Sequence, residues 1–233
     1  MNVKSSLAVM CFAASFACQS AQAAIQAMAT RVIYEAPASA ATLTIKNNVS
    51  KPYMVQTWLE GKTGETKNLP IIVVPPLLKL DPDKESILKF IYSGQGLPTN
   101  QESLFWINIQ EIPPTAQEKN VLQLAIRSRI KLFYRPKEVK TSLDDAVKQL
   151  NWFVDGQQLK VTNPSPLHIT IGVLKLNAQG KPLDILCRIC MVAPNSTITV
   201  LEHIPVTTQT ISFTYINDYG GATAVPSVNI HRK

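Results

Sequence analysis

Short runs of alternating or β-branched residues, separated by Gly, Pro and Asn, make up most of the first half of the chain. Such runs are typical of strands that bury one face. The predicted strands span 30–34, 41–47, 53–60, 70–74, 86–92, 104–111 and 121–133. That number of strands within roughly 110 residues predicts an immunoglobulin-like β-sandwich. Trp58 and Trp106 lie inside two of these strands, where we expect both rings to pack in the core.

The second half repeats the strand pattern less regularly. The predicted strands span 159–162, 169–176, 197–201, 211–216 and 225–231. Between the halves, Arg135-Pro136 ends a long strand, and a polar stretch follows with a weak helical pattern at 143–150. Asp144-Asp145 suits the N-terminal cap of that helix better than a catalytic acid–base pair. We therefore expect two all-β sandwich domains, over 24–140 and 141–233.

The first 23 residues have the order of a secretory signal peptide. Lys4 precedes an apolar stretch, and Ala21-Gln22-Ala23 supplies the small residues of a cleavage site. Cys18 opens the alternative of a lipoprotein signal, which Ser15 three positions earlier disfavours. No later apolar run approaches the roughly 20 residues that span a bilayer. We expect an exported protein without membrane insertion, with Ala24 as its first mature residue.

The mature chain keeps two cysteines, Cys187 and Cys190. An oxidising compartment favours their pairing in a disulfide. A redox Cys-x-x-C usually begins a helix, whereas the residues around this pair have the pattern of strand and loop. Two thiolates alone do not make a zinc site. We favour a structural disulfide, with a redox role as the alternative.

The net charge of the chain is +7, and it falls to +6 (7 − 1) when Lys4 leaves with the signal peptide. A basic surface attracts nucleic acid, anionic lipid or an acidic protein partner. Export from the cytoplasm makes nucleic acid the least favoured of the three. We expect no nucleic-acid partner.

No sequence pattern motivates an enzyme. His168, His203 and His231 lie far apart, without acidic or cysteine companions at metal-ligand spacing, and we expect each to be an ordinary surface or strand residue. The chain contains no nucleophile elbow, zinc-protease helix, P-loop or dinucleotide fingerprint. We expect no catalytic residue, no metal and no cofactor.

The run from Val121 to Pro136 is the most informative segment. Its apolar residues share one parity, so a strand would carry them on one face. They are Leu122, Leu124, Ile126, Ile130, Leu132 and Tyr134. The run exceeds the usual strand of about five or six residues, and a polar loop precedes its first half, so that half is expected at a sheet edge. A long apolar edge is an aggregation liability unless a partner uses it.

With this segment, the chain resembles the periplasmic chaperones of the chaperone-usher pilus pathway, the PapD-like family. Six stretches carry the resemblance in order along essentially the whole mature chain. They are 29–34, Pro75-Pro76, 102–106, 130–136, Asn163-Pro164 and 216–221. The short connection over 112–120 resembles the branch of the family that assembles rod-like pili. The close pair of cysteines departs from the family pattern.

The resemblance implies two immunoglobulin-like domains in an L-shaped arrangement, with a cleft between them. It also implies a non-enzymatic function in the periplasm. The chaperone binds and stabilises pilus subunits that lack the last strand of their own sandwich, and it delivers them to an outer-membrane usher. The missing strand is supplied by the chaperone's own edge strand, which is recognition by strand addition.

Motif matching to the family assigns roles at the binding edge. Leu122, Leu124 and Ile126 match the side chains that enter the subunit's groove. Arg31 and Lys131 match the two cations that hold the subunit's C-terminal carboxylate, for which charge-assisted hydrogen bonds are well suited. Without the resemblance, both cations would be read as surface charges.

Motif matching also assigns two sites outside the edge. Glu102, Arg135 and Asp218 match a charged cluster between the domains, although three unrelated surface charges are the plainer alternative. Pro75 and Pro76 match the surface that faces the usher, although a turn explains a Pro-Pro pair adequately.

Two other functional classes remain as alternatives. A pilus subunit or adhesin would share the signal peptide and the strand pattern, but it would need a donor extension at its mature N-terminus, and Ala24 to Met28 is too short for one. A periplasmic thiol oxidoreductase would need an α/β pattern, which the chain does not show.

Overall fold

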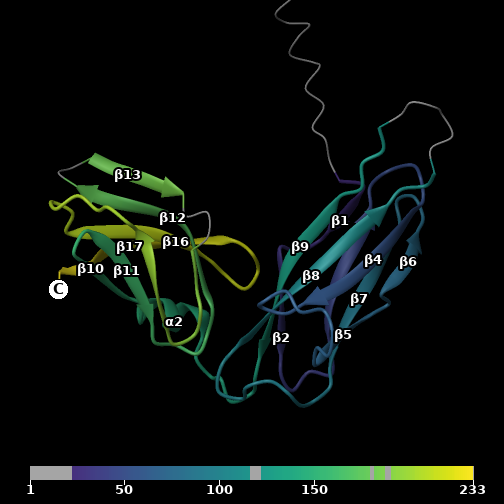
Figure 1. Ribbon diagram of the computed structural model, residues 1–233, viewed down its shortest axis with the longest axis horizontal. Helices are drawn as coiled ribbons and strands as arrows, with labels where there is room; N and C mark the ends of the chain where they lie inside the picture. The colour runs from purple at the N-terminus through teal and green to yellow at the C-terminus, as the bar shows by residue number, and fades with distance from the viewer. Residues whose placement is uncertain (1–22, 116–121, 179–180, 187–189, 233) are drawn as a thin grey trace, which may run out of the picture.

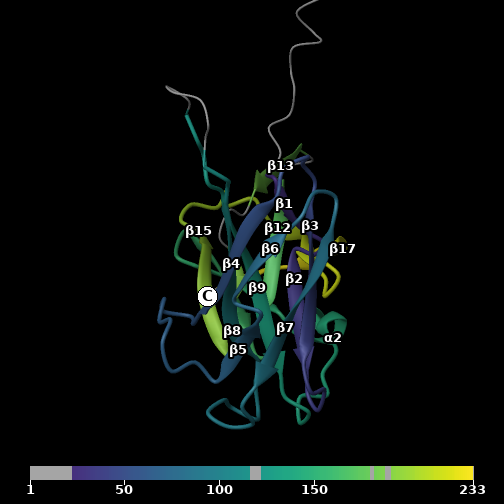
Figure 2. The same cartoon turned by 90° about the vertical axis from the view of Figure 1, so that its right-hand side faces the viewer.

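The computed structural model describes residues 23–115, 122–178, 181–186 and 190–232. The strands form two β-sandwiches, one after the other along the chain. Figure 1 shows them as two lobes that meet at one end and diverge toward the other, and Figure 2 shows one behind the other. The expected all-β fold with two immunoglobulin-like domains is confirmed. The predicted signal peptide falls, except for Ala23, outside the described residues.

The first sandwich pairs a sheet of order β1-β3-β7-β5 with a sheet of order β2-β9-β8-β4-β6. Its strands are β1 (Ile25–Ala27), β2 (Arg31–Glu35), β3 (Ala41–Asn47), β4 (Tyr53–Glu60), β5 (Ile71–Val74), β6 (Leu77–Leu80), β7 (Glu85–Tyr92), β8 (Ser103–Ile112) and β9 (Arg127–Arg135). Each predicted segment of this half overlaps one of these strands. The sequence pattern missed β1 and β6, because strands of three and four residues are too short to show alternation.

The second sandwich pairs a sheet of order β15-β11-β10-β18 with a sheet of order β13-β12-β16-β17, and β14 adds to β12. Its elements are α2 (Leu143–Lys148), β10 (Asn151–Asp155), β11 (Gln158–Asn163), β12 (Ile169–Ala178), β13 (Lys181–Leu186), β14 (Met191–Val192), β15 (Ser196–Leu201), β16 (Thr210–Ile216), β17 (Ala222–Asn229) and β18 (His231–Arg232). The prediction missed β10, β13 and β14. None of the described helices is long and apolar enough to cross a membrane.

Helix α2 belongs to the second domain. Its residues Leu143, Ala146 and Val147 are buried in that domain's core. The expected cap at Asp144-Asp145 is wrong: Ser142 is the N-cap, and its Oγ accepts a hydrogen bond from the backbone N–H of Asp145. The two aspartates occupy the first turn instead, where their negative charge interacts favourably with the positive end of the helix dipole.

The expectation that both tryptophans pack in the core is wrong. Trp58 and Trp106 are half-buried on the outer face of their sheet, because their strands bury the opposite parity. The guanidinium of Arg129 lies 4.3 Å from the ring centroid of Trp106, and it also pairs with Glu60 at 2.9 Å. These contacts hold the start of β9 against β8 and β4.

Strand β9 is shorter than the predicted 121–133 segment. Pairing begins at Arg127, opposite Gln110 of β8. Beyond Ile112, β8 runs into Pro113-Pro114, which cannot donate ladder hydrogen bonds. One more backbone contact continues toward this end, from the N–H of Glu111 to the carbonyl oxygen of Ile126 at 3.1 Å, and the described residues 122–125 have no strand pairing.

Asn163 organises the loops of the second domain from a fully buried position. Its Nδ2 donates to the carbonyl oxygens of Leu167 at 2.7 Å, Ala193 at 3.0 Å and Val192 at 3.3 Å. Its Oδ1 accepts from the backbone N–H and the Oγ of Ser165. The Asn163 side chain thus supplies hydrogen bonds to backbone groups of these loops.

Asn163→Ala should destabilise the second domain by about 3 kcal/mol, because buried backbone carbonyls lose their donor. The matched control is Asn151→Ala, at the exposed first position of β10, which should stay within about 0.5 kcal/mol of the parent. Urea unfolding followed by circular dichroism measures both. Equal stability of the two variants would contradict the role given to Asn163.

Candidate functional site

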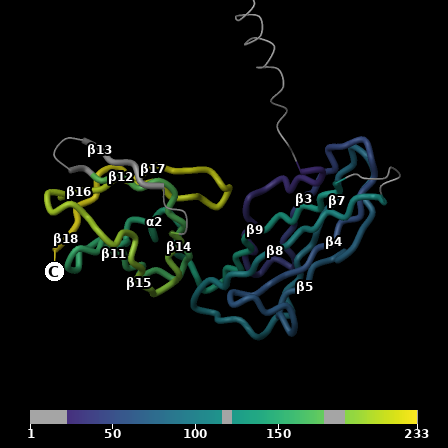
Figure 3. Tube along the Cα trace, turned by 45° about the horizontal axis from the view of Figure 1, so that its top comes forward, coloured from purple at the N-terminus to yellow at the C-terminus, as the bar shows by residue number. Residues whose placement is uncertain are grey.

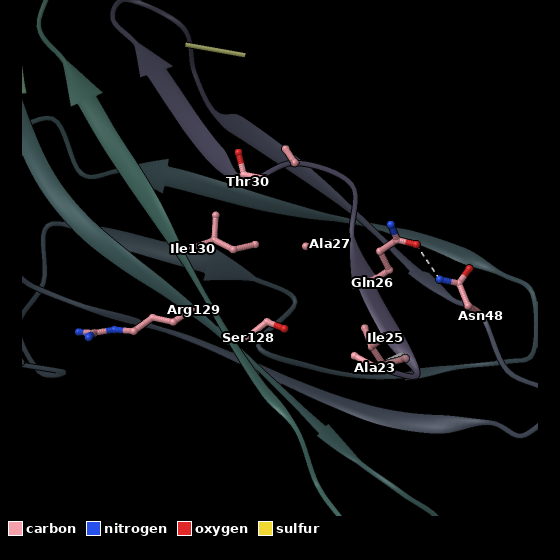
Figure 4. A pocket seen from close by; sticks show the side chains of 10 residues that line it. Ala23, Ile25, Gln26, Ala27, Thr30, Asn48, Ser128, Arg129 and Ile130 are labelled. Carbon is pink, nitrogen blue, oxygen red and sulfur yellow. Dashed lines mark hydrogen bonds between the residues drawn. The ribbon is translucent and has the colours of Figure 1, made fainter. Parts of the chain in front are cut away.

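A groove of about 580 Å³ lies between β1 and the start of β9. Figure 4 shows Ser128 and Ile130 on the side of β9 that faces Ile25 and Ala27, whereas the Arg129 side chain extends the opposite way. On the β9 side, β8 occupies one edge, but β2 pairs with the other edge only from Lys131 onward. Strand β1 is an edge strand of the other sheet, and among the described strands it pairs only with β3. The groove is thus bounded by unpaired strand edges.

The segment just before β9 displays large apolar side chains to solvent. Leu122 is 86 % exposed, Leu124 68 % and Ile126 42 %. Ile130 on the same parity is only 7 % exposed, and Leu132 is fully buried. The apolar series of the sequence therefore divides into a buried half that packs in the core and an exposed half that does not. An exposed apolar series beside an open edge indicates a partner.

Arg31 and Lys131 are direct partners across the parallel strands β2 and β9. The Arg31 Nη1 donates to the carbonyl oxygen of Ile216 at 3.0 Å, and the Lys131 Nζ donates to Thr170 Oγ1 at 3.4 Å. Both acceptors come from the second domain. The two cations therefore stand where the open edge of β9 reaches the junction of the domains.

The two cations are held in an environment that disfavours their charge. Burial lowers the pKa of Arg31 below its ordinary value, against the smaller effects of Asp218 and Glu102. Burial, and then the charge of Arg31, lower the pKa of Lys131. The Nε of Arg31 is buried and has no hydrogen-bond partner among the described residues. A bound anion would offset the desolvation and mutual repulsion of the two cations and would accept their hydrogen bonds. The geometry of Arg31 and Lys131 therefore favours an anionic ligand.

Glu102, Arg135 and Asp218 meet at the domain junction. Arg135 donates from Nε and Nη2 to Glu102 Oε1, at 3.0 and 2.9 Å, and from Nη1 to Asp218 Oδ2 at 2.9 Å. Burial alone would lower the pKa of Arg135, but the hydrogen bond and charge of Asp218 and those of Glu102 outweigh it and raise the pKa. A paired and hydrogen-bonded cluster of this kind fixes the approach of the two domains.

His168 joins this cluster, which the sequence did not predict. Its backbone N–H donates to Glu102 Oε2 at 2.8 Å, and its Nδ1 lies 3.2 Å from the same oxygen. Its ring also contacts Phe133 of β9. The expectation of an ordinary surface or strand residue fails because His168 is buried between the domains. No spacing rule in the sequence links it to Glu102.

Pro75 and Pro76 lie where the chain leaves one sheet of the first domain for the other, between β5 and β6. The carbonyl oxygen of Pro76 accepts from the backbone N–H of Thr57 at 2.8 Å. A local structural role therefore exists for this pair, as the sequence allowed. The two prolines lie outside the groove and the charged cluster.

The structure also bears on the cysteine pair and on metal binding. Cys190 is disulfide-bonded. Cys187, its expected partner, lies outside the described residues. In the described part of the chain, no three His, Cys, Asp or Glu side chains gather in a way that would hold a metal ion.

Comparisons with known proteins agree with this architecture. Residues 24–140 match the family described as the pili and flagellar-assembly chaperone PapD N-terminal domain, and residues 145–226 match the pili assembly chaperone PapD C-terminal domain. A probable fimbrial chaperone LpfB of Escherichia coli O157:H7 is 34 % identical over 206 residues, which cover 86 % of each chain.

Solved structures show the same likeness. The YadV chaperone aligns with a TM-score of 0.77 at 33 % identity, covering 89 % of this chain and 100 % of that one. The SafB chaperone of Salmonella enterica, solved in complex with the SafA pilin, aligns with a TM-score of 0.78 at 29 % identity, covering 91 % of this chain and 98 % of that one. The chain described here belongs to the PapD family of pilus-assembly chaperones.

Proposed function

We propose that this protein binds pilus subunits in the periplasm, keeps them folded by lending them its β9 edge, and delivers them to an outer-membrane usher. The observation that carries the proposal is the open edge of β9 with its exposed apolar side chains at Leu122, Leu124 and Ile126. The solved complex of SafB with the SafA pilin supports a subunit as the partner. No step of this function needs catalysis or a cofactor.

The open edge acts through backbone and side chains together. A subunit strand pairs with the open edge along 122–130, opposite the edge that β8 occupies, and so obtains affinity from main-chain hydrogen bonds. The apolar side chains on alternate positions enter the subunit's groove and set the register, because a slip by one residue would point them away. Burial of three such side chains contributes roughly 1.5 to 3 kcal/mol each before ordering costs.

Arg31 and Lys131 anchor the end of the subunit strand in this proposal. A terminal carboxylate that reaches the junction accepts charge-assisted hydrogen bonds from both cations. The carboxylate also returns the pKa of Lys131 toward its ordinary value, because an opposite charge favours the protonated amine. The cluster of Arg135 with Glu102 and Asp218 keeps the second domain's acceptors in place beside them.

The usher-facing surface is proposed around Pro75 and Pro76. Leu77, which follows them, is exposed, and so are Met54 and Ile112, which face each other on β4 and β8. Leu77 lies on β6, the strand of this sheet farthest from β2, where an exposed apolar side chain suits a second partner. Residues 1–23 are proposed as the signal peptide that directs the chain to the periplasm, and 24–140 and 141–233 as the domains.

Lys131→Met should leave the free protein as stable as the parent or slightly more so, since a desolvated cation is removed. Subunit binding should weaken by about 2 to 5 kcal/mol, because the terminal carboxylate loses one of its partners. The matched control is Lys89→Met, at an exposed lysine of β7. The readouts are thermal melting and recovery of subunit from periplasm, identified by mass spectrometry. Normal recovery with Lys131→Met would refute the anchoring role.

Leu124→Glu and Ile130→Glu separate an exposed edge from a core strand. Ile130 is 7 % exposed, so its replacement buries an unpaired charge and should cost several kcal/mol of stability. Leu124→Glu should leave free stability within about 0.5 kcal/mol of the parent and abolish subunit capture, since the carboxylate would enter an apolar groove. Urea unfolding and subunit capture are measured for both. Equal destabilisation by the two substitutions would rule out the edge assignment.

A further inference from the structure

The loop between β16 and β17 presents a large aromatic side chain to solvent. Tyr219 is 97 % exposed, the highest value among the large apolar side chains of the described residues. The loop reaches from the second domain toward the first, beside β2, in both Figure 1 and Figure 3. The ring therefore contributes almost nothing to the folding of the free protein.

The loop is held in one conformation before any partner arrives. Asn217 Oδ1 accepts from the backbone N–H groups of Tyr219 at 3.1 Å and Gly221 at 2.9 Å, and its Nδ2 donates to Thr223 Oγ1 at 3.2 Å. Gly220 has a φ of 86°, in the region that favours glycine. A contact made by Tyr219 thus costs little backbone ordering.

The loop is also fixed against the first domain beside the cation pair. Ile216 accepts from Arg31, and Asp218 pairs with Arg135. At Gly220, an added Cβ would lie 2.2 Å from Thr30 Oγ1, so the loop backbone packs directly on the residue before Arg31. Thr30 lines the groove between β1 and β9 as well. Tyr219 therefore stands at the end of the groove where the cations lie.

We propose that Tyr219 is a contact residue for the subunit, and that its ring packs on the side chains of the last two residues before the carboxylate at Arg31 and Lys131. This rests on the proposed function. A turn needs Asn217 and the glycines but gains nothing from an exposed aromatic. Tyrosine is among the residues that dominate binding energy at interfaces, because its rigid ring buries apolar area while its hydroxyl stays hydrated.

The partner segment follows from the surroundings of Tyr219. The groove delivers an extended strand, the cations select a chain end with a free carboxylate, and the loop adds an apolar ring beside that end. Tyr219 thereby makes the second domain part of the recognition surface and gives it a preference for apolar over small terminal residues. In this proposal the second domain contacts the terminal residues of the subunit, and the first domain pairs with the strand that leads to them.

The test uses the full mature chain and synthetic peptides of alternating valine and threonine with a free terminal carboxylate. One peptide ends in two leucines and the other in two glycines. Tyr219→Ala should bind the leucine peptide about tenfold more weakly in calorimetric titration, and Tyr219→Phe should stay within about twofold of the parent. With the glycine peptide, Tyr219→Ala should lose less than about twofold. Val206→Ala is the control and should change neither affinity, because Val206 is another exposed apolar residue, in the loop between β15 and β16, and its carbonyl oxygen accepts from Arg232 Nη2 of the same domain.

The outcomes are distinguishable. Unchanged affinity of Tyr219→Ala for the leucine peptide, while Lys131→Met loses it, overturns the inference and leaves the proposed function standing. An equal loss with both peptides also overturns it, because the residue would then act through the loop and not by contact. If the parent binds neither peptide, or binds amidated peptides equally well, the carboxylate anchor and the inference both fail.

Discussion

The uneven pairing of β9 is the constraint on which the rest of the structure depends. From Lys131 onward the strand has neighbours on both sides, β8 and β2, and its side chains form the core of the first domain. Before Lys131 it has β8 alone, and before Arg127 the only backbone contact with β8 among the described residues is the hydrogen bond from the N–H of Glu111 to the carbonyl oxygen of Ile126. One series of apolar residues, interrupted only by Ser128, therefore provides both core side chains and the exposed edge to which we assign subunit binding.

The domain junction places charge at the point where the edge becomes covered. Arg135 ties Glu102 of the first domain to Asp218 of the second through hydrogen bonds of 2.9 to 3.0 Å, and His168 contacts the same glutamate. This satisfied network lies beside Arg31 and Lys131, for which the described chain provides no ion pair. In the function proposed above, the paired charges hold the two domains together, and the two cations without an ion pair bind the subunit's carboxylate.

The sequence predicted the longer strands well, because alternation over six or more residues is a strong signal, as in β3 and β4. The prediction failed where contacts with neighbouring strands decide which side chains are buried and where a strand begins. Trp58 and Trp106 face outward because neighbouring residues occupy the buried parity, and β9 begins only at Arg127, opposite Gln110 of β8. The cluster of Arg135 was suggested by family resemblance, but the contact of His168 with Glu102 joins residues 66 apart, which no local pattern encodes.

The central claim is that the backbone N–H groups of Leu124 and Ile126 are unpaired in the free protein and become paired when a subunit binds. Amide hydrogen exchange of these groups, with and without bound subunit, tests it most directly. The account predicts rapid exchange at Leu124 and Ile126 in the free protein and strong protection in the complex, with Leu132 protected in both. Protection already present in the free chain, or unchanged exchange on binding, would contradict it.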